Sequence, residues 1–135
     1  MSASASATIG AVTVDAFLGG KVEALQPRAG HHRSGLEAVL LSAAIEASFS
    51  GLLVDLGAGA GVAGLCIAAR CAGARMLLVE RDAGLVACAR ETLALPANAG
   101  FAARVEITET DVAAPEASRA TAGLARAVAD AVVMN

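Results

Sequence analysis

The stretch VDLGAGAG, residues 54–61, joins an apolar run to a carboxylate and three alternating glycines. Glycine tolerates a sharp turn and lets a ligand approach the backbone closely. A helix that begins directly after the glycines would point its first free N–H groups into the same crevice. The stretch therefore predicts a strand, a tight turn and a helix that together hold a nucleotide-like ligand.

Outward from this turn, apolar runs of strand length alternate with segments of helical periodicity. We expect strands at 52–56, 75–80, 103–108 and 131–134, and helices at 62–71, 83–95 and, weakly, 117–127. Strands separated by helices of this length imply βαβ units and a parallel sheet. The unbroken run LLV at 77–79 fits a strand that is buried on both faces. The pattern predicts an α/β protein with a Rossmann-like parallel sheet.

Before the glycine turn, the sequence predicts a hairpin and a helix. Runs at 12–17 and 21–26 flank Gly19-Gly20, which is typical of a β-hairpin. Ser34 and Glu37 fit a capping box that starts a helix reaching about residue 47. Its expected apolar face consists of Leu36, Val39, Leu40, Ala43 and Ala44. Residues 1–10, rich in Ser and Ala, are expected to be a flexible tail, and residues 11–135 to be one domain.

Composition narrows the class of protein. The chain has 135 residues, is 56% hydrophobic and carries a net charge of −3, which excludes a disordered chain and a strongly basic nucleic-acid clamp. Its three cysteines form no Cys-x-x-Cys pair, so we expect them to be core hydrophobes rather than metal or redox groups. Residues 51–69 contain one charge but too many glycines for a good membrane helix. Residues 1–10 contain no basic segment typical of a secretory signal, so we expect a cytoplasmic protein without a membrane partner.

Two carboxylates distinguish between the ligands that the turn could hold. Residues 59–64 match the Gly-x-Gly-x-x-Gly dinucleotide pattern, but Asp55 lies two residues before Gly57, the first glycine of the turn, where it would repel a pyrophosphate. S-adenosylmethionine has no phosphate and carries an ammonium and a sulfonium, so Asp55 would attract it. Glu80 ends the next strand, 19 positions after Gly61, where a carboxylate can accept hydrogen bonds from ribose hydroxyls. We favour S-adenosylmethionine; an NAD(P)-dependent oxidoreductase and a turn without ligand remain as alternatives.

The order acidic-Leu-Gly-x-Gly-x-Gly at 55–61 resembles the class I S-adenosylmethionine-dependent methyltransferases. The resemblance implies that the acidic residue lies near the methionine end and that the acidic residue after the next strand binds the ribose. It also implies that an Asp after the third strand, with the following amide, contacts the adenine. The cofactor-binding residues implied in this chain are Asp55, Gly57, Ala58, Gly59, Gly61, Glu80, Arg81, Asp111 and Val112.

The end of the chain suggests the methyl acceptor. Asp130 and Asn135 flank an apolar run, which resembles the start of the Asp-x-x-x-x-Asn-Pro-Pro-aromatic signature of methyltransferases that act on planar nitrogens. By this resemblance Asn135 is the catalytic residue that orients an adenine or guanine amine, or a protein glutamine amide. Pro-Pro-aromatic and the family's last three strands do not follow Asn135. We therefore expect a domain cut at its fourth core strand, or a non-catalytic remnant.

Residues 26–41 resemble the leading segment of the bacterial tRNA(Val) adenine exocyclic-amine methyltransferases. The resemblance implies an adenine of tRNA as acceptor, and it places residues 33–37 at the border of the cofactor pocket. His31 and His32 have no accompanying metal-ligand spacing, so we expect them to be solvated loop residues, with no metal site.

Overall fold

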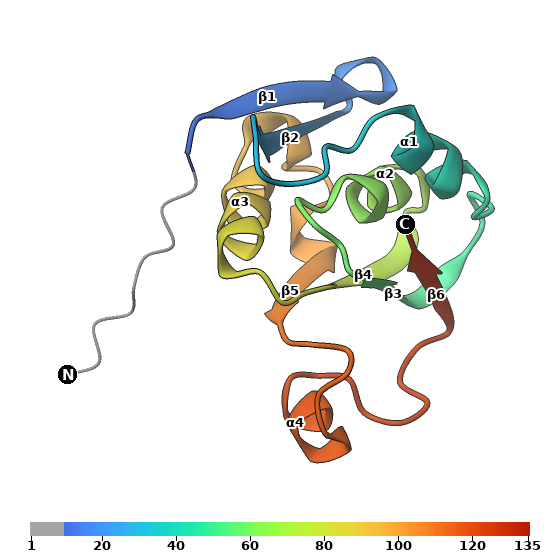
Figure 1. The fold of residues 1–135 in the computed structure, drawn as a ribbon. Helices are drawn as coiled ribbons and strands as arrows, with labels where there is room; N and C mark the ends of the chain where they lie inside the picture. Colours follow the sequence, from blue (N-terminus) through green and yellow to red (C-terminus); the bar gives the residue numbers. More distant parts are fainter. Residues whose placement is uncertain (1–9) are drawn as a thin grey trace.

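A four-stranded parallel sheet forms the centre of the protein. The computed structural model describes residues 10–135, so the predicted tail lies outside the described residues except for Gly10. The strands are β3 (Ser50–Leu56), β4 (Gly73–Glu80), β5 (Val105–Glu109) and β6 (Ala131–Met134), in the order β5-β4-β3-β6. Every neighbouring pair is parallel (Figure 1). The predicted Rossmann-like sheet is thus confirmed.

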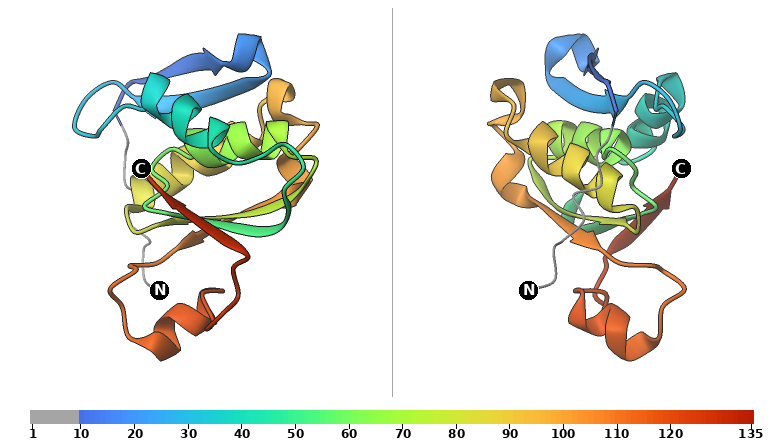
Figure 2. Two further views of the ribbon diagram at one scale, coloured as in Figure 1. Left: turned by 90° about the vertical axis from the view of Figure 1, so that its right-hand side faces the viewer. Right: turned by 60° about the vertical axis from the view of Figure 1, so that its left-hand side comes forward.

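Helices cover the two faces of the sheet unequally. Figure 2 shows α1 (Leu36–Ala43), α2 (Val62–Arg70) and α3 (Ala83–Leu93) on one side, and α4 (Glu116–Thr121) with its long loops on the other. The main core lies under α2, whose residues 62–68 are all buried. A smaller cluster on the α4 side contains Val54, Leu77 and Val79, with Leu124 packed against them. All three cysteines are free and buried, as expected for core hydrophobes.

The predicted hairpin forms, with β1 (Val12–Phe17) antiparallel to β2 (Val22–Pro27). It packs outside α2 and α3 rather than joining the sheet (Figure 1). Asn98, which has no exposed surface, fastens it: Nδ2 donates to the carbonyls of Glu23 (2.8 Å) and Thr92 (2.7 Å), and Oδ1 accepts the N–H of Glu23 (3.1 Å). The Oγ1 of Thr92, also fully buried, accepts the N–H of Leu25 at 2.9 Å. Buried polar groups near the end of α3 therefore fix the position of the hairpin.

Asp130 fixes the register of β6 against β3. Its Oδ2 accepts the N–H of Leu52 at 2.8 Å, and its own N–H donates to the carbonyl of Leu52 at 2.8 Å. The Asp130 carboxylate fills the space beside Gly51 that a Cβ would need, and Gly51 has a φ of 116°. Glycine at this position therefore lets the carboxylate reach the backbone of β3.

The predicted capping box is wrong. Gly35, not Ser34, is the N-cap of α1, and Ser34 uses its N–H to donate to Gln26 Oε1 at 2.8 Å. Glu37 does reach back, but to the N–H of Gly35 at 2.9 Å. The helix also ends at Ala43 rather than near residue 47. Hydrogen bonds to the hairpin hold the chain before the helix, so the helix begins one residue later than the local pattern suggests.

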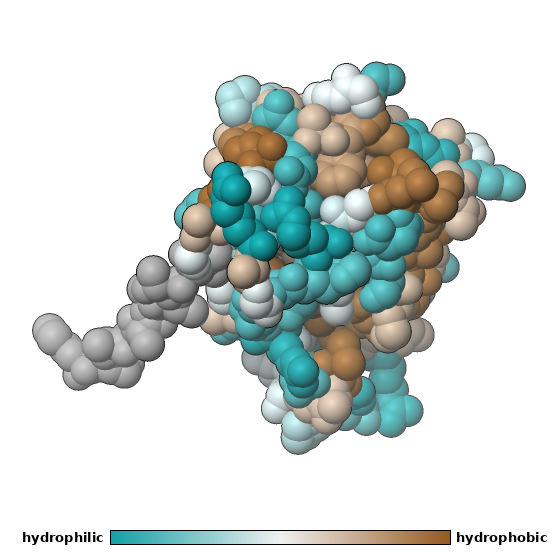
Figure 3. All heavy atoms as spheres, turned by 45° about the horizontal axis from the view of Figure 1, so that its top comes forward, coloured by the Kyte–Doolittle hydropathy of each residue, from teal (hydrophilic) through white to brown (hydrophobic). Residues whose placement is uncertain are grey.

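The predicted apolar face of α1 is also wrong. Leu36 and Leu40 are 70% and 61% exposed, whereas Ala38 and Ser42 are buried. Figure 3 shows hydrophobic surface on the side of the molecule where α1 lies in Figure 1. The hydrogen bonds of Ser34 and Gly35 fix the start of α1. Because α1 is short, these contacts determine which of its faces is buried, and the buried face is not the most apolar one.

The other boundaries shift by a few residues. Strand β5 begins at Val105 because residues 102–104 form a 3-10 turn, from which Arg104 donates to carbonyls at the end of α2 and the start of β4. The weak helix predicted at 117–127 is limited to α4, and Gly123 follows it with a φ of 98°. Within the described residues, no helix has the length and apolar character needed to cross a membrane.

Candidate cofactor site

The glycine turn lies at the carboxyl ends of β3 and β4. Gly57, Gly59 and Gly61 all have positive φ, and Gly61 is the N-cap of α2 with a φ of 94°. A Cβ on Gly61 would lie 2.9 Å from Leu78 Cδ1, so only glycine lets the turn pack this closely on β4. The N–H of Ala58 donates to the carbonyl of Val79 at 2.9 Å and holds the turn over the neighbouring strand.

Asp55 lies beneath this turn, where the backbone N–H of Gly64 is nearby but no hydrogen bond of normal geometry reaches its carboxylate from residues 10–135. Asp55 is 1% exposed, and neither of its carboxylate oxygens has a hydrogen-bond partner among the described residues. Burial raises the pKa of Asp55 to about 7; the backbone amide of Gly64 opposes this rise, and the negative charge of Glu80 adds to it. A buried carboxylate without partners is costly. A cationic or hydrogen-bond-donating ligand would remove this cost.

Glu80, the last residue of β4, connects the turn to the following loop. Its Oε1 accepts the N–H of Gly59 at 3.0 Å, and its Oε2 accepts the N–H of Asp82 at 2.9 Å. An ionised carboxylate has about four lone-pair sites, so both oxygens can still accept a ligand hydroxyl. Glu80 therefore shapes the site as well as facing it.

Asp55 and Glu80 meet the glycine turn in a cavity of about 260 Å³. Most of the predicted site residues line it, namely Asp55, Gly57, Ala58, Gly59, Glu80 and Asn135. The rest of its lining consists of His31, His32, Ser34, Ala60, Ala63 and Leu85. The two histidines were expected only as solvated loop residues, and their place in this lining had no signal in the sequence. Gly61 shapes the turn without lining the cavity.

A second cavity, of about 180 Å³, shares Gly57 and Glu80 with the first. It collects the remaining predicted residues, Arg81, Asp111 and Val112. Arg81 Nη1 lies 3.9 Å from Asp111 Oδ2, and Asp111 Oδ1 accepts the N–H of Ala113 at 2.8 Å. Asp111 thus shapes its own loop while its other oxygen faces Arg81. Because the two cavities share residues, they adjoin along the carboxyl edge of the sheet.

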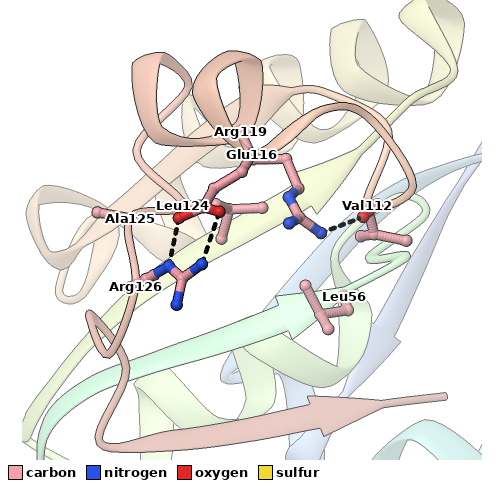
Figure 4. Close-up of a pocket in the computed structure, with 7 residues that line it drawn as sticks. All are labelled: Leu56, Val112, Glu116, Arg119, Leu124, Ala125 and Arg126. Carbon is pink, nitrogen blue, oxygen red and sulfur yellow. Dashed lines mark hydrogen bonds and ion pairs between the residues drawn. The ribbon is translucent and has the colours of Figure 1, made fainter.

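A third hollow, of about 340 Å³, lies on the α4 side of the sheet over Leu56 (Figure 4). Its charged side chains already have partners: Arg126 forms an ion pair with Glu116, and Arg119 donates to the carbonyl of Val112 at 3.0 Å. It has no counterpart to the partnerless carboxylate of Asp55. We therefore place the candidate cofactor site in the first two cavities.

Solved structures with similar folds include methyltransferases. A predicted O-methyltransferase from Agrobacterium tumefaciens is 41% identical, with a TM-score of 0.68 over 73% of this chain and 47% of that one. TYW2 of Pyrococcus horikoshii, solved in complex with MeSAdo, is 24% identical with a TM-score of 0.61 over 74% of this chain and 36% of that one, and it shows similarity of fold alone. This chain thus spans half or less of the length of these relatives. None of the curated proteins matches it.

The family comparison covers most of the chain. Residues 34–135 match the methyltransferase small domain, a span that includes the glycine turn, all of the four-stranded sheet and the lining of both cavities apart from His31 and His32. The match supports the methyltransferase interpretation over the dinucleotide-dependent oxidoreductase, and it supports S-adenosylmethionine as the cofactor. The chain belongs to the methyltransferase small domain family.

Proposed function

We propose that this chain is the cofactor-binding part of an S-adenosylmethionine-dependent methyltransferase. The observation that carries the proposal is Asp55, a buried carboxylate without a partner at the base of a glycine turn. The cofactor supplies an activated methyl group on a sulfonium. The charge of Asp55 suits a cationic ligand and would oppose the pyrophosphate of a dinucleotide.

The remaining residues fit the parts of this cofactor. Glu80, which faces the first cavity, would accept hydrogen bonds from the ribose hydroxyls. Asp111 and the amide of Val112 would meet the adenine in the second cavity, with Arg81 beside them. The backbone of Gly57, Ala58 and Gly59 would lie against the ligand between the cavities. TYW2 binds MeSAdo in a fold of this kind, which supports an adenosine-type ligand.

For the acceptor, we propose a planar nitrogen, with an adenine amine of tRNA first and a protein glutamine amide second. Asn135 lines the first cavity, next to Asp55 and Glu80. Its side-chain oxygen can accept a hydrogen bond from an amine N–H and aim the nitrogen lone pair toward the cavity. Such positioning can supply a large part of a methyltransferase rate. The name of the relative from A. tumefaciens favours an oxygen acceptor instead, which is the alternative to a nitrogen acceptor.

Calorimetry with S-adenosylhomocysteine tests the cofactor proposal. We expect the protein to bind it, and Asp55→Asn to weaken binding by about 10- to 100-fold, because a charge-assisted hydrogen bond contributes about 1.5–3 kcal/mol. Glu106→Gln is the matched control, since it removes one exposed negative charge from β5. Binding of NAD but not of S-adenosylhomocysteine would contradict the proposal and favour an oxidoreductase. Binding of neither would favour a non-catalytic remnant.

Transfer of a labelled methyl group tests the acceptor. We expect label to enter unmodified tRNA, with base-stable attachment to adenine, and Asn135→Ala to abolish transfer while cofactor binding persists. Label in a hydroxyl-bearing small molecule, with none in tRNA or protein, would favour the oxygen acceptor.

A further inference from the structure

One wall of the first cavity, formed by residues 31–34, has no role in the site as described so far. His31, His32 and Ser34 line the cavity from this wall, together with the residues of the glycine turn. We propose that His31 binds the carboxylate at the amino-acid end of the cofactor, and that the hairpin positions His31 for this contact. The proposal rests on the proposed function.

The charges in the cavity separate the two ends of a zwitterion. Asp55 and Glu80 are the carboxylates of the lining, and both suit the ammonium and the hydroxyls of the ligand. A ligand carboxylate would be repelled by both of them and would need a hydrogen-bond donor elsewhere in the lining. His31 and His32 line the same cavity, and an imidazole has at least one N–H donor in either protonation state.

Of the two histidines, His31 is the one whose ring has no hydrogen-bond partner within residues 10–135. His32 Nε2 lies 3.3 Å from Glu37 Oε1, and its side chain is 76% exposed. His31 is half-buried, and within residues 10–135 its ring makes no hydrogen bond. The ring of His31 can therefore donate to a ligand without breaking a contact.

The backbone on which His31 sits is held in place by Gln26, which is 2% exposed. Gln26 Nε2 donates to the carbonyl of Ser34 at 3.0 Å, and Gln26 Oε1 accepts the N–H of Ser34 at 2.8 Å. The same Nε2 donates to Asp15 Oδ2 at 3.0 Å.

Arg33 adds a second attachment between the wall and the hairpin. It donates to Asp15 Oδ2 at 2.7 Å and to the carbonyl of Pro27 at 2.9 Å. A wall ordered before the ligand arrives loses little entropy on binding. Gln26 and Arg33 are thus positioning residues for His31.

Two ligands that differ only at the amino-acid end test the assignment. S-adenosylhomocysteine carries the carboxylate, whereas 5′-methylthioadenosine has the same nucleoside and sulfur without it. In calorimetry, His31→Asn should weaken S-adenosylhomocysteine by about tenfold, as expected for one charge-assisted contact, and leave 5′-methylthioadenosine unchanged. His32→Asn tests the neighbouring ring of the same wall, and under this assignment it should keep the wild-type preference for S-adenosylhomocysteine.

Imidazole NMR gives a readout that does not depend on affinity. The chain has only two histidines, so the ring signals that disappear in His31→Asn identify those of His31. We expect these signals to move when S-adenosylhomocysteine is added and to stay when 5′-methylthioadenosine is added. Arg33→Gln, at a side chain 37% exposed, should reduce the preference for S-adenosylhomocysteine without changing the affinity for 5′-methylthioadenosine.

The outcomes distinguish a failure of the His31 assignment from a failure of the proposed function. If the wild type binds both ligands and His31→Asn weakens neither or both equally, His31 does not bind the carboxylate, although the proposed function stands. If His32→Asn alone loses the preference, the assignment to His31 is wrong. If Arg33→Gln keeps the wild-type preference, the hairpin does not position the wall. If the wild type binds neither ligand, the proposed function itself fails.

Discussion

Replacing Asp55 by Asn should stabilise the unliganded protein, and by more as the pH rises. Asp55 is 1% exposed, and burial raises its pKa from 3.8 to about 7. Between these two values the unfolded chain releases the proton while the folded protein retains it. The wild type therefore loses stability with rising pH over this window. The loss of stability is absent below the pKa of Asp55 in the unfolded chain and reaches its full size above the pKa of Asp55 in the folded protein.

The size of the effect follows from the width of the window. Each unit of pH well inside it changes the free energy of unfolding by about 1.4 kcal/mol, and the slope falls off near the folded pKa, which gives about 2 kcal/mol between pH 5 and pH 7. Asn at this position cannot ionise, so the variant lacks this loss. Both the protonated acid and the amide need hydrogen bonds that the pocket does not supply, so the absolute gain is smaller than its pH dependence.

Urea unfolding followed by far-UV circular dichroism measures this difference, since the chain has no Trp or Tyr for fluorescence. The stability of Asp55→Asn relative to the wild type should grow by about 2 kcal/mol from pH 5 to pH 7 and then level off. Glu106→Gln, which removes an exposed carboxylate, controls for the loss of one charge. A difference that stays constant from pH 5 to pH 8 would refute the reasoning, because it would mean that the folded protein accommodates the charged carboxylate as well as water does.

Two further substitutions test the packing around the site. Gly64→Ala should lower the free energy of unfolding by about 1–3 kcal/mol, because its Cβ would overlap Leu78 Cδ2, whereas Gly100→Ala, with no atom within 4 Å of the added Cβ, should change it by less than about 0.5 kcal/mol. Equal effects at the two glycines in urea titrations would contradict this packing. Asn98→Ala should cost about 3 kcal/mol, because it leaves buried backbone groups of Glu23 and Thr92 without partners. A thermal unfolding midpoint equal to that of the wild type would show that the hairpin is held by other contacts.

The features that could be predicted from the sequence are those in which a local pattern determines the structure. The glycines at 57, 59 and 61 and the apolar runs on both sides of them suffice for the turn, the buried strands and the parallel sheet. The same pattern placed Asp55 and Glu80 at adjacent strand ends, which is where they lie. Hydrophobic periodicity and composition can be read from each short segment by itself, and the alternation of strands and helices that they indicate predicts the parallel sheet.

The features that could not be predicted depend on contacts between distant segments. Ser34 has the right neighbours for an N-cap, but a side chain from the hairpin takes its N–H, and the helix starts later. Gln26 and Asn98 are single polar residues with no periodic signal, yet each binds a segment that the chain pattern does not connect to it. His31 and His32 line the candidate cofactor site, and Gln26 of the hairpin is hydrogen-bonded to Ser34 at the end of their loop.

The two hydrogen bonds between Asp130 and Leu52 have a consequence for folding during synthesis on the ribosome. The two residues are 78 positions apart, and β3 lies between β4 and β6 in the sheet. At roughly 5–20 residues per second, one edge of β3 would wait roughly 4–16 s for its partner to be made. During that interval a nascent apolar strand presents open N–H and C=O groups to other chains. Chaperones that bind extended apolar segments would bind β3 during this interval. Gly51→Ala, whose Cβ would clash with the Asp130 carboxylate, should lengthen the time for which β3 stays exposed.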